Sequence, residues 1–190
     1  MSRRPIYPIQ SLILNRWSPR ALSGEAMTDD ELMPLFEAAR WAPSSYNNQP
    51  WRFVYARRDT PAWVTFVELL GEFNKGWAPQ AAALVVVVAK SVFDYNGKPS
   101  VTHQFDTGAA WENLALEANA RGLVAHGMEG FDYKTAKQRL EIPDDHVVLA
   151  MIAIGKPGKK EDLSEELQER ERPSDRRPLS EIVMEGRFRS

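Results

Sequence analysis

The sequence predicts an α+β fold in which a single layer of sheet is wrapped by helices. Two continuous apolar runs of strand length, 83–89 (ALVVVVA) and 147–154 (VVLAMIAI), are typical of strands that helices cover on both faces. Residues 105–121 are apolar around almost the whole helical circumference, which predicts a central helix. A chain of 190 residues is long enough for one domain with one core, so we expect residues 1–190 to form one unit.

The first predicted helix covers residues 28–41. Thr28 and Glu31 form a capping-box pattern, and apolar residues then recur at helical spacing until Pro43. The next element, residues 51–57 (WRFVYAR), has the aromatic and β-branched content of a strand. The segment between them connects a helix to a strand.

Further along the chain, residues 61–73 place apolar side chains on one stripe, which predicts a single helix there. Gly122 is expected to end the central helix as a C-cap, and a short strand-like stretch follows at 123–126 (LVAH). With the two apolar runs, these elements complete the predicted sheet and its helices.

The last part of the chain differs in character. Residues 156–177 carry seven acids and seven bases among 22 positions, which predicts a solvated, charged arm. Residues 178–190 regain apolar character, so we expect this C-terminal segment to dock, either on its own sheet or on a neighbouring subunit.

Composition excludes several classes of protein. The net charge of −2 and the pI of about 6.0 offer no global attraction to nucleic acid or anionic lipid. The chain has no cysteine, which excludes disulfides, thiolate metal sites and a cysteine nucleophile. The longest apolar run, 81–89, is too short to span a bilayer, and the first residues lack the apolar stretch of a secretory signal. We therefore expect a cytoplasmic protein with no membrane partner.

The common catalytic motifs are absent. There is no GxGxxG, no GxxxxGK[ST] and no GxSxG, which argues against a dinucleotide fingerprint, a P-loop and a serine-hydrolase elbow. His103, His126 and His146 stand about twenty residues apart without the spacing of metal ligands, so no metal site is predicted.

Two basic clusters lie near opposite ends of the chain. Residues 16–20 read RWSPR, in which Arg16 and Arg20 flank Ser18, and a second pair, Arg176 and Arg177, precedes a proline. Guanidinium groups with a nearby hydroxyl suit a phosphate, because arginine presents a planar fork of donors. A solvated basic turn is the alternative interpretation of RWSPR alone.

The loop WAPSSYNNQPW at 41–51 concentrates small polar side chains between Pro43 and Pro50. Such donors and acceptors suit the edge of a flat ligand, whereas in the alternative the side chains cap the local backbone. These side chains are Ser44, Ser45, Asn47 and Gln49. Residues 127–132 (GMEGFD) favour the ligand, because two glycines let main-chain amides approach it closely.

Five motifs in this order resemble the nitroreductase family of FMN-dependent oxidoreductases: RWSPR, ARWAPSSYNNQPWRF, FNK, GLVAHGMEGFD and RRPLSEIV. The resemblance spans residues 16–183, and its most specific parts are PSSxNxQPW and GLxxxxMEGFD. It implies a nitroreductase-like fold with a mostly antiparallel central sheet. It also implies a domain-swapped homodimer with FMN in clefts at the subunit interface.

The resemblance further implies where FMN is held. Arg16, Ser18 and Arg20 would hold the phosphate and ribityl chain, with Arg176 or Arg177 completing the clamp. Trp17 lies in the same segment, where the family usually has a polar residue, and packing at the subunit interface is its alternative role. Ser44, Ser45, Asn47 and Gln49 belong to the loop that would reach the flavin from the partner subunit, shaped by Pro43.

Two further motifs complete the implied site. Asn74 would face the pyrimidine side of the flavin, followed by Lys75, whereas the family's lysine often lies three residues after the asparagine, where this chain has Trp77. The segment from Gly127 through Met128 would place the backbone amide of Glu129 or Gly130 near flavin N5, and no side chain would act as an acid or base.

The implied activity is ping-pong hydride transfer from NADH or NADPH, through the flavin, to a small planar acceptor such as a nitroaromatic or quinone. Residues 90–104 would form a short lid. Three alternatives stay open: another reaction of the same fold such as dehalogenation or flavin destruction, a flavin-binding protein for storage or sensing, and a carrier of apolar ligands without flavin.

Overall fold

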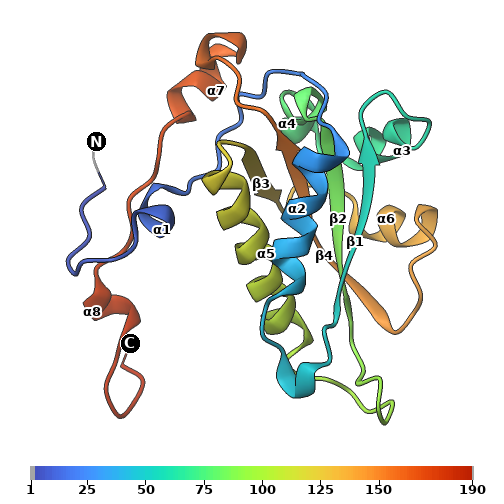
Figure 1. Ribbon diagram of the computed structural model, residues 1–190, viewed down its shortest axis with the longest axis vertical. Helices are drawn as coiled ribbons and strands as arrows, with labels where there is room; N and C mark the ends of the chain where they lie inside the picture. The colour runs from blue at the N-terminus through green and yellow to red at the C-terminus, as the bar shows by residue number, and fades with distance from the viewer. Residues whose placement is uncertain (1–2, 190) are drawn as a thin grey trace.

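The computed structural model describes residues 3–189, and within them an antiparallel sheet forms the centre of the molecule (Figure 1). Its strands are β1 (Trp51–Arg57), β2 (Ala83–Lys90), β3 (Val124–Met128) and β4 (His146–Gly155), in the spatial order β1-β2-β4-β3. The two apolar runs of the sequence are therefore the two inner strands, and the predicted α+β class is confirmed.

Both faces of the inner strands are buried, because side chains alternate between two separate apolar layers. One layer contains Leu84, Val86, Val88, Met151 and Ala153, and the other contains Val85, Val87, Ile152 and Ile154. This alternation explains why the two runs contain almost no polar residue.

Helices α2 (Asp29–Arg40) and α5 (His103–Ala120) cover one face (Figure 1). The predicted capping box begins α2: Thr28 Oγ1 accepts from the Glu31 N–H at 3.3 Å, and Glu31 Oε2 accepts from the Thr28 N–H at 2.8 Å. Gly122 (φ +69°) follows α5, and the Leu123 N–H donates to the Ala118 carbonyl at 2.8 Å, so the predicted C-cap is confirmed.

The other face is covered by α3 (Trp63–Leu69) and α6 (Tyr133–Arg139), together with α4 (Glu72–Lys75) and the 3-10 turn η2 (Ala78–Gln80). The prediction of one helix over 61–73 is wrong, because Leu70 is extended and pairs with Phe131. The Gly71 N–H donates to the Gly130 carbonyl at 2.9 Å. A long-range backbone contact therefore interrupts a helix that the apolar stripe alone would continue.

The charged arm is partly packed, so the prediction of a wholly solvated segment at 156–177 is wrong. The arm contains the 3-10 turn η3 (Lys160–Asp162) and helix α7 (Glu165–Arg170). Leu167 is 5% exposed and belongs to the apolar layer under α3, and Glu171 is also buried. The arm is attached to the core by Leu167, by the partly buried Leu163, and by Glu171, whose carboxylate accepts from the N–H groups of Arg20 and Ala21.

This attachment predicts a stability effect. Leu167→Ala should lower the free energy of unfolding by about 2–5 kcal/mol, because a buried leucine leaves a cavity. Urea unfolding measures the change. Glu169→Ala, an exposed substitution on the same helix, is the matched control and should leave the midpoint unchanged. Equal midpoints for the two variants would show that the arm does not pack on the core.

The terminal segments carry short helices, α1 (Ser11–Asn15) and α8 (Leu179–Ile182), of which α8 lies apart from the sheet (Figure 1). Apolar side chains are exposed in both segments: Ile6, Tyr7, Ile9 and Ile13 near one end, and Ile182, Val183 and Phe188 near the other. Of the two expected docking places for 178–190, the chain's own sheet is not used, and docking on a neighbouring subunit stays a prediction. Within residues 3–189, no helix is long and apolar enough to cross a membrane.

Candidate functional site

The turn after β3 is held by two hydrogen bonds to one carbonyl group. The Gly130 oxygen accepts from the Gly71 N–H and from Asn74 Nδ2, each at 2.9 Å. Asn74 is buried, and its Oδ1 accepts from the indole N–H of Trp77 at 3.1 Å. Trp77, which stands where the family often has a lysine, therefore orients the asparagine that supports the turn.

The fixed carbonyl leaves donors on the turn without partners. Within residues 3–189, the N–H groups of Glu129 and Gly130 meet no acceptor, and both residues are exposed. A Cβ on Gly130 would lie 2.9 Å from Asn74 Nδ2, and one on Gly127 would lie 3.2 Å from the Trp111 ring. A side chain at Gly130 would therefore displace Asn74, and one at Gly127 would crowd Trp111. Two amides of this turn remain available to a ligand.

The RWSPR segment places a hydroxyl beside a guanidinium, as its composition predicts. Arg16 Nη1 donates to Ser18 Oγ at 3.3 Å, and Arg16 Nε lies 3.6 Å from Glu112 Oε1 on α5. The Arg16 side chain is only 16% exposed. Trp17 is half-buried. Arg16 and Ser18 therefore form a preorganised pair of donors for an anion.

Arg20 is held differently. Its main-chain N–H donates to both carboxylate oxygens of Glu171, at 2.8 and 3.1 Å, and its guanidinium lies over the Phe73 ring at 5.8 Å. Among the described residues, Arg20 Nε is a buried donor without a partner. A buried donor without a protein partner is costly, so the Nε–H of Arg20 is available to a ligand group or to solvent.

His126 links these two segments. Its Nδ1 lies 2.9 Å from the Pro19 carbonyl oxygen, and its ring packs on Trp77 with centroids 4.6 Å apart. Burial lowers the pKa of His126, assisted by the positive charge of Arg20 and opposed by the Pro19 carbonyl and Glu171. His126 is therefore a neutral connection between the RWSPR segment and the Trp77–Asn74 pair.

This lowered pKa has a testable consequence. Because the unfolded chain binds a proton at the ordinary value of about 6.5, protonation favours unfolding, and stability is lost as the pH falls below that value. Urea unfolding of the wild type should therefore show a falling midpoint between about pH 7 and pH 5.5, and His126→Asn should weaken this dependence. The same slope in both proteins would assign it to other groups.

The loop between α2 and β1 is backbone-strained. Tyr46, Asn47 and Gln49 have φ values of 52°, 52° and 49°, in the left-handed region that non-glycine residues rarely adopt. The buried carboxylate of Asp106 accepts from the Ser45 N–H at 3.1 Å, and Ser44 Oγ accepts from the Gln49 N–H at 3.0 Å. Ser44 therefore caps the local backbone, as the alternative interpretation of this loop predicts. Backbone strain of the kind seen at Tyr46, Asn47 and Gln49 is typical of functional sites.

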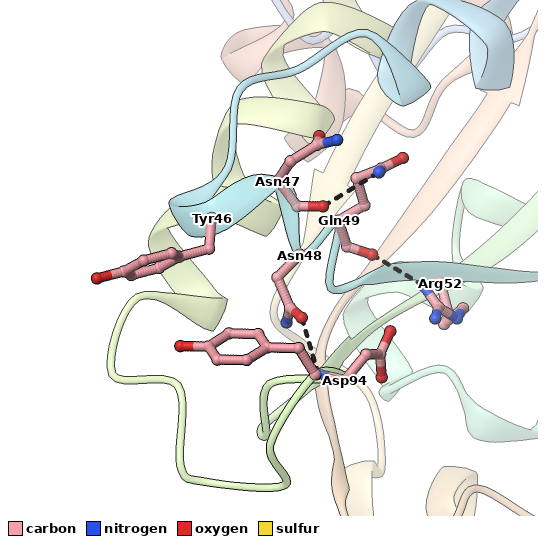
Figure 2. Close-up of a pocket in the computed structure, with 7 residues that line it drawn as sticks. Tyr46, Asn47, Asn48, Gln49, Arg52 and Asp94 are labelled. Atoms are coloured by element: carbon pink, nitrogen blue, oxygen red, sulfur yellow. Dashed lines mark hydrogen bonds between the residues drawn. The ribbon is translucent and has the colours of Figure 1, made fainter.

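This loop borders an open cavity of about 390 Å³ (Figure 2). Asn48 Oδ1 accepts from the Asp94 N–H at 3.0 Å and so joins the loop to the predicted lid. Aromatic rings stand at the rim, with the Tyr46 and Tyr95 centroids 5.8 Å apart. The lining residues are Tyr46, Asn47, Asn48, Gln49, Arg52, Asp94 and Tyr95.

The predicted site residues fall into two groups within one chain. The segments 16–20, 74–77 and 127–130 are joined through His126, Trp77 and Asn74. The loop 43–49 lies at the opposite end of the sheet from α4 (Figure 1). One subunit therefore does not bring the two predicted parts of the flavin site together.

The remaining predicted residues are placed as follows. Lys75 is exposed and pairs with Glu72 at 2.7 Å. Met128 is buried in the core, and Arg177 is exposed. Arg176 is exposed and donates to Ser174 Oγ at 3.1 Å.

Several supporting residues of these sites carry no recognisable pattern in the sequence. Trp77 donates to Asn74, which supports the turn at 127–130, and Asp106 accepts from the Ser45 N–H in the loop 43–49. Arg3 donates to the carbonyl of Arg16. Only Trp77 had a signal, as a departure from the family pattern. The other two are single polar residues without a motif.

Comparisons with known proteins identify the family and the fold of this chain. The sequence profile of the nitroreductase family matches residues 13–62 and 60–156. A solved oxidoreductase containing FMN is 46% identical and superposes with a TM-score of 0.94 over 98% of this chain and 96% of that chain. Protein DrgA from Synechocystis is 34% identical over 70% of this chain and 79% of its own length.

A more distant structure extends the comparison. An FMN complex from Desulfovibrio desulfuricans, named as a candidate nitroreductase, is 27% identical with a TM-score of 0.70, over 94% of this chain and 96% of that chain. A protein from Archaeoglobus fulgidus, named as a candidate NADH dehydrogenase or NAD(P)H nitroreductase, is 28% identical over 81% of this chain and 88% of its own length.

Proposed function

Because the chain belongs to the nitroreductase family and has its fold, we propose that it is an FMN-dependent oxidoreductase that uses NADH or NADPH to reduce planar electrophiles such as nitroaromatics or quinones. The observation that carries this proposal is the turn at 127–130. Its carbonyl is fixed from two sides, while its two exposed N–H groups meet no acceptor within residues 3–189.

The residues of this chain suit FMN at both ends of the cofactor. Arg16 and Ser18 offer charge-assisted donors to the phosphate, and the unpaired Nε of Arg20 offers another donor on the same segment. The amides of Glu129 and Gly130 are the donors for the ring. FMN bound by these residues would supply the hydride and electron-transfer chemistry between a reduced nicotinamide and the acceptor.

The main-chain donors explain why no acid or base side chain is needed. Backbone N–H groups do not titrate, and they stabilise negative charge where it develops if they are already oriented. Asn74 and Trp77 supply that orientation by holding the Gly130 carbonyl. The chain thus contributes electrostatic stabilisation and position.

We propose a homodimer as the complete form of the site. Two copies would let the loop 43–49 of one meet the turn 127–130 of the other, which a single chain keeps at opposite edges of the sheet, beside the outer strands β1 and β3. The exposed apolar side chains of both terminal segments support an exchange of these segments between subunits.

The class of acceptor follows from the cavity at the strained loop. Tyr46 and Tyr95 are 80% and 63% exposed at its rim, and such rings pack well against a flat aromatic acceptor. Arg52 adds a guanidinium group that suits a nitro or quinone oxygen.

The test is to mix purified, FMN-loaded protein with NADH or NADPH without oxygen. We expect the yellow absorbance to bleach within the time of one turnover and to return on addition of a quinone or nitroaromatic. Persistent colour would instead indicate a flavin-binding protein without turnover, and protein that does not retain FMN would refute the proposal.

A further inference from the structure

Arg3 connects three parts of the chain that are far apart in sequence. Its Nε donates to the Ser174 carbonyl at 3.0 Å, and its Nη1 donates to the carbonyls of Leu14 at 2.8 Å and Arg16 at 2.6 Å. One half-buried guanidinium therefore joins the C-terminal segment to the residues just before the RWSPR motif.

This contact brings like charges together. Arg176 Nη1 donates to the same Ser174 carbonyl at 3.4 Å, so the guanidiniums of Arg3 and Arg176 share an acceptor. Burial and the positive charges of Arg176 and Arg16 lower the pKa of Arg3, and Asp175 opposes this. An arginine keeps its charge in proteins, so these guanidinium groups repel one another, and Asp175 offsets part of that repulsion.

Resting on the proposed function, we propose that Arg3 is a positioning residue of the phosphate site: it holds segment 174–176 against residues 14–16 so that Arg16 and Arg176 act on one phosphate group. Of the two C-terminal arginines in the predicted clamp, this contact selects Arg176. A phosphate dianion would offset the repulsion among these arginines and accept hydrogen bonds from the guanidinium groups of Arg16 and Arg176.

The experiment compares two ligands that differ only in the phosphate group. Dissociation constants of FMN and riboflavin are measured by flavin fluorescence for the full chain freed of flavin. The proteins compared are the wild type, Arg3→Ala, Arg3→Lys, Arg176→Ala, the double variant of Arg3→Ala with Arg176→Ala, and Arg4→Ala. Arg4 is the exposed neighbour and serves as the matched control. Thermal unfolding of each variant verifies that it is folded.

We expect Arg3→Ala to weaken the affinity for FMN about ten-fold and to leave the affinity for riboflavin unchanged, because only the contacts to the phosphate are affected. Arg3→Lys should behave like Arg3→Ala, since an ammonium group cannot reproduce the planar fork that spans these carbonyls. Arg176→Ala should weaken the affinity for FMN when introduced into the wild type but cause little further loss in Arg3→Ala, because Arg3 and Arg176 act as a unit.

Other results would overturn the inference. An unchanged FMN affinity in Arg3→Ala would show that the contact is irrelevant to the phosphate, and equal losses for FMN and riboflavin would show that Arg3 supports the fold alone. An FMN affinity equal to that of the wild type in Arg3→Lys would show that the positive charge of residue 3, rather than its hydrogen bonds to the two segments, sets the affinity. Failure of the wild type to bind FMN would remove the proposed function as well, whereas the other outcomes leave it intact.

Discussion

Replacing Arg16 with alanine should release FMN from the protein on dialysis. Charge-assisted hydrogen bonds from a guanidinium are each worth about 1.5–3 kcal/mol, so we expect an affinity loss of about 10- to 100-fold. The Arg16 side chain is largely buried and lies beside Ser18. Its removal also leaves Glu112 to repel the phosphate, which adds to the loss.

Equilibrium dialysis with FMN measures the effect, with Arg40→Ala as control. Arg40 is exposed at the end of α2, pairs with Glu37 and belongs to none of the segments proposed to bind the phosphate, so its loss should leave the phosphate contribution to FMN binding unchanged. Glu112→Gln should strengthen binding slightly by removing the nearby negative charge. Unchanged FMN affinity in Arg16→Ala would exclude Arg16 from the phosphate site.

Gly130→Ala should damage both stability and redox function. The added Cβ would lie 2.9 Å from Asn74 Nδ2, so the bond to the Gly130 carbonyl must break or the turn must move. The cost comes from this contact, because Gly130 is not among the residues with positive φ. We expect a loss of about 1–3 kcal/mol in the free energy of unfolding.

The redox effect of Gly130→Ala should be larger than its effect on stability. Displacing one oriented main-chain donor from developing charge costs about 10²-fold in rate in comparable sites. Single-turnover bleaching by NADPH measures this rate, and potentiometry should show a more negative flavin potential. The Gly130 amide is proposed to act on the flavin ring, so Gly130→Ala should change the reduction rate and the flavin potential. Arg16→Ala should instead change the affinity for FMN.

Gly108→Ala is the matched control for a glycine substitution. Gly108 lies in α5, and a Cβ there would have nothing within 4 Å. Alanine favours a helix over glycine by about 0.5–1 kcal/mol, so this variant should be slightly more stable and reduce FMN at the wild-type rate. If Gly130→Ala behaved in the same way, the turn at 127–130 would have no special role.

Local sequence patterns predicted the site only in outline. The guanidinium and hydroxyl of RWSPR and the glycines of GMEGFD are chemically recognisable. The structure places Arg16 beside Ser18, and among the described residues the amides of Glu129 and Gly130 meet no acceptor. The residues that orient them could not be predicted. Trp77, Asp106 and Arg3 each act through one or a few contacts, which no composition or spacing reveals.

The sequence alone determined the features that depend on neighbouring residues. These are the capping box at Thr28, the glycine that ends α5, and the two apolar runs that became the inner strands β2 and β4. Periodicity and end-capping involve residues within a few positions of each other, so a local pattern contains all the information needed.

Only the tertiary structure decided where the local pattern is overruled. The helix predicted over 61–73 is broken because Gly71 bonds to Gly130, and the charged arm is anchored because Leu167 enters the core. Arg3 reaches Ser174 across 171 positions of the chain. Such contacts add hydrogen bonds and buried area that outweigh local propensity, and they exist only after the chain has folded.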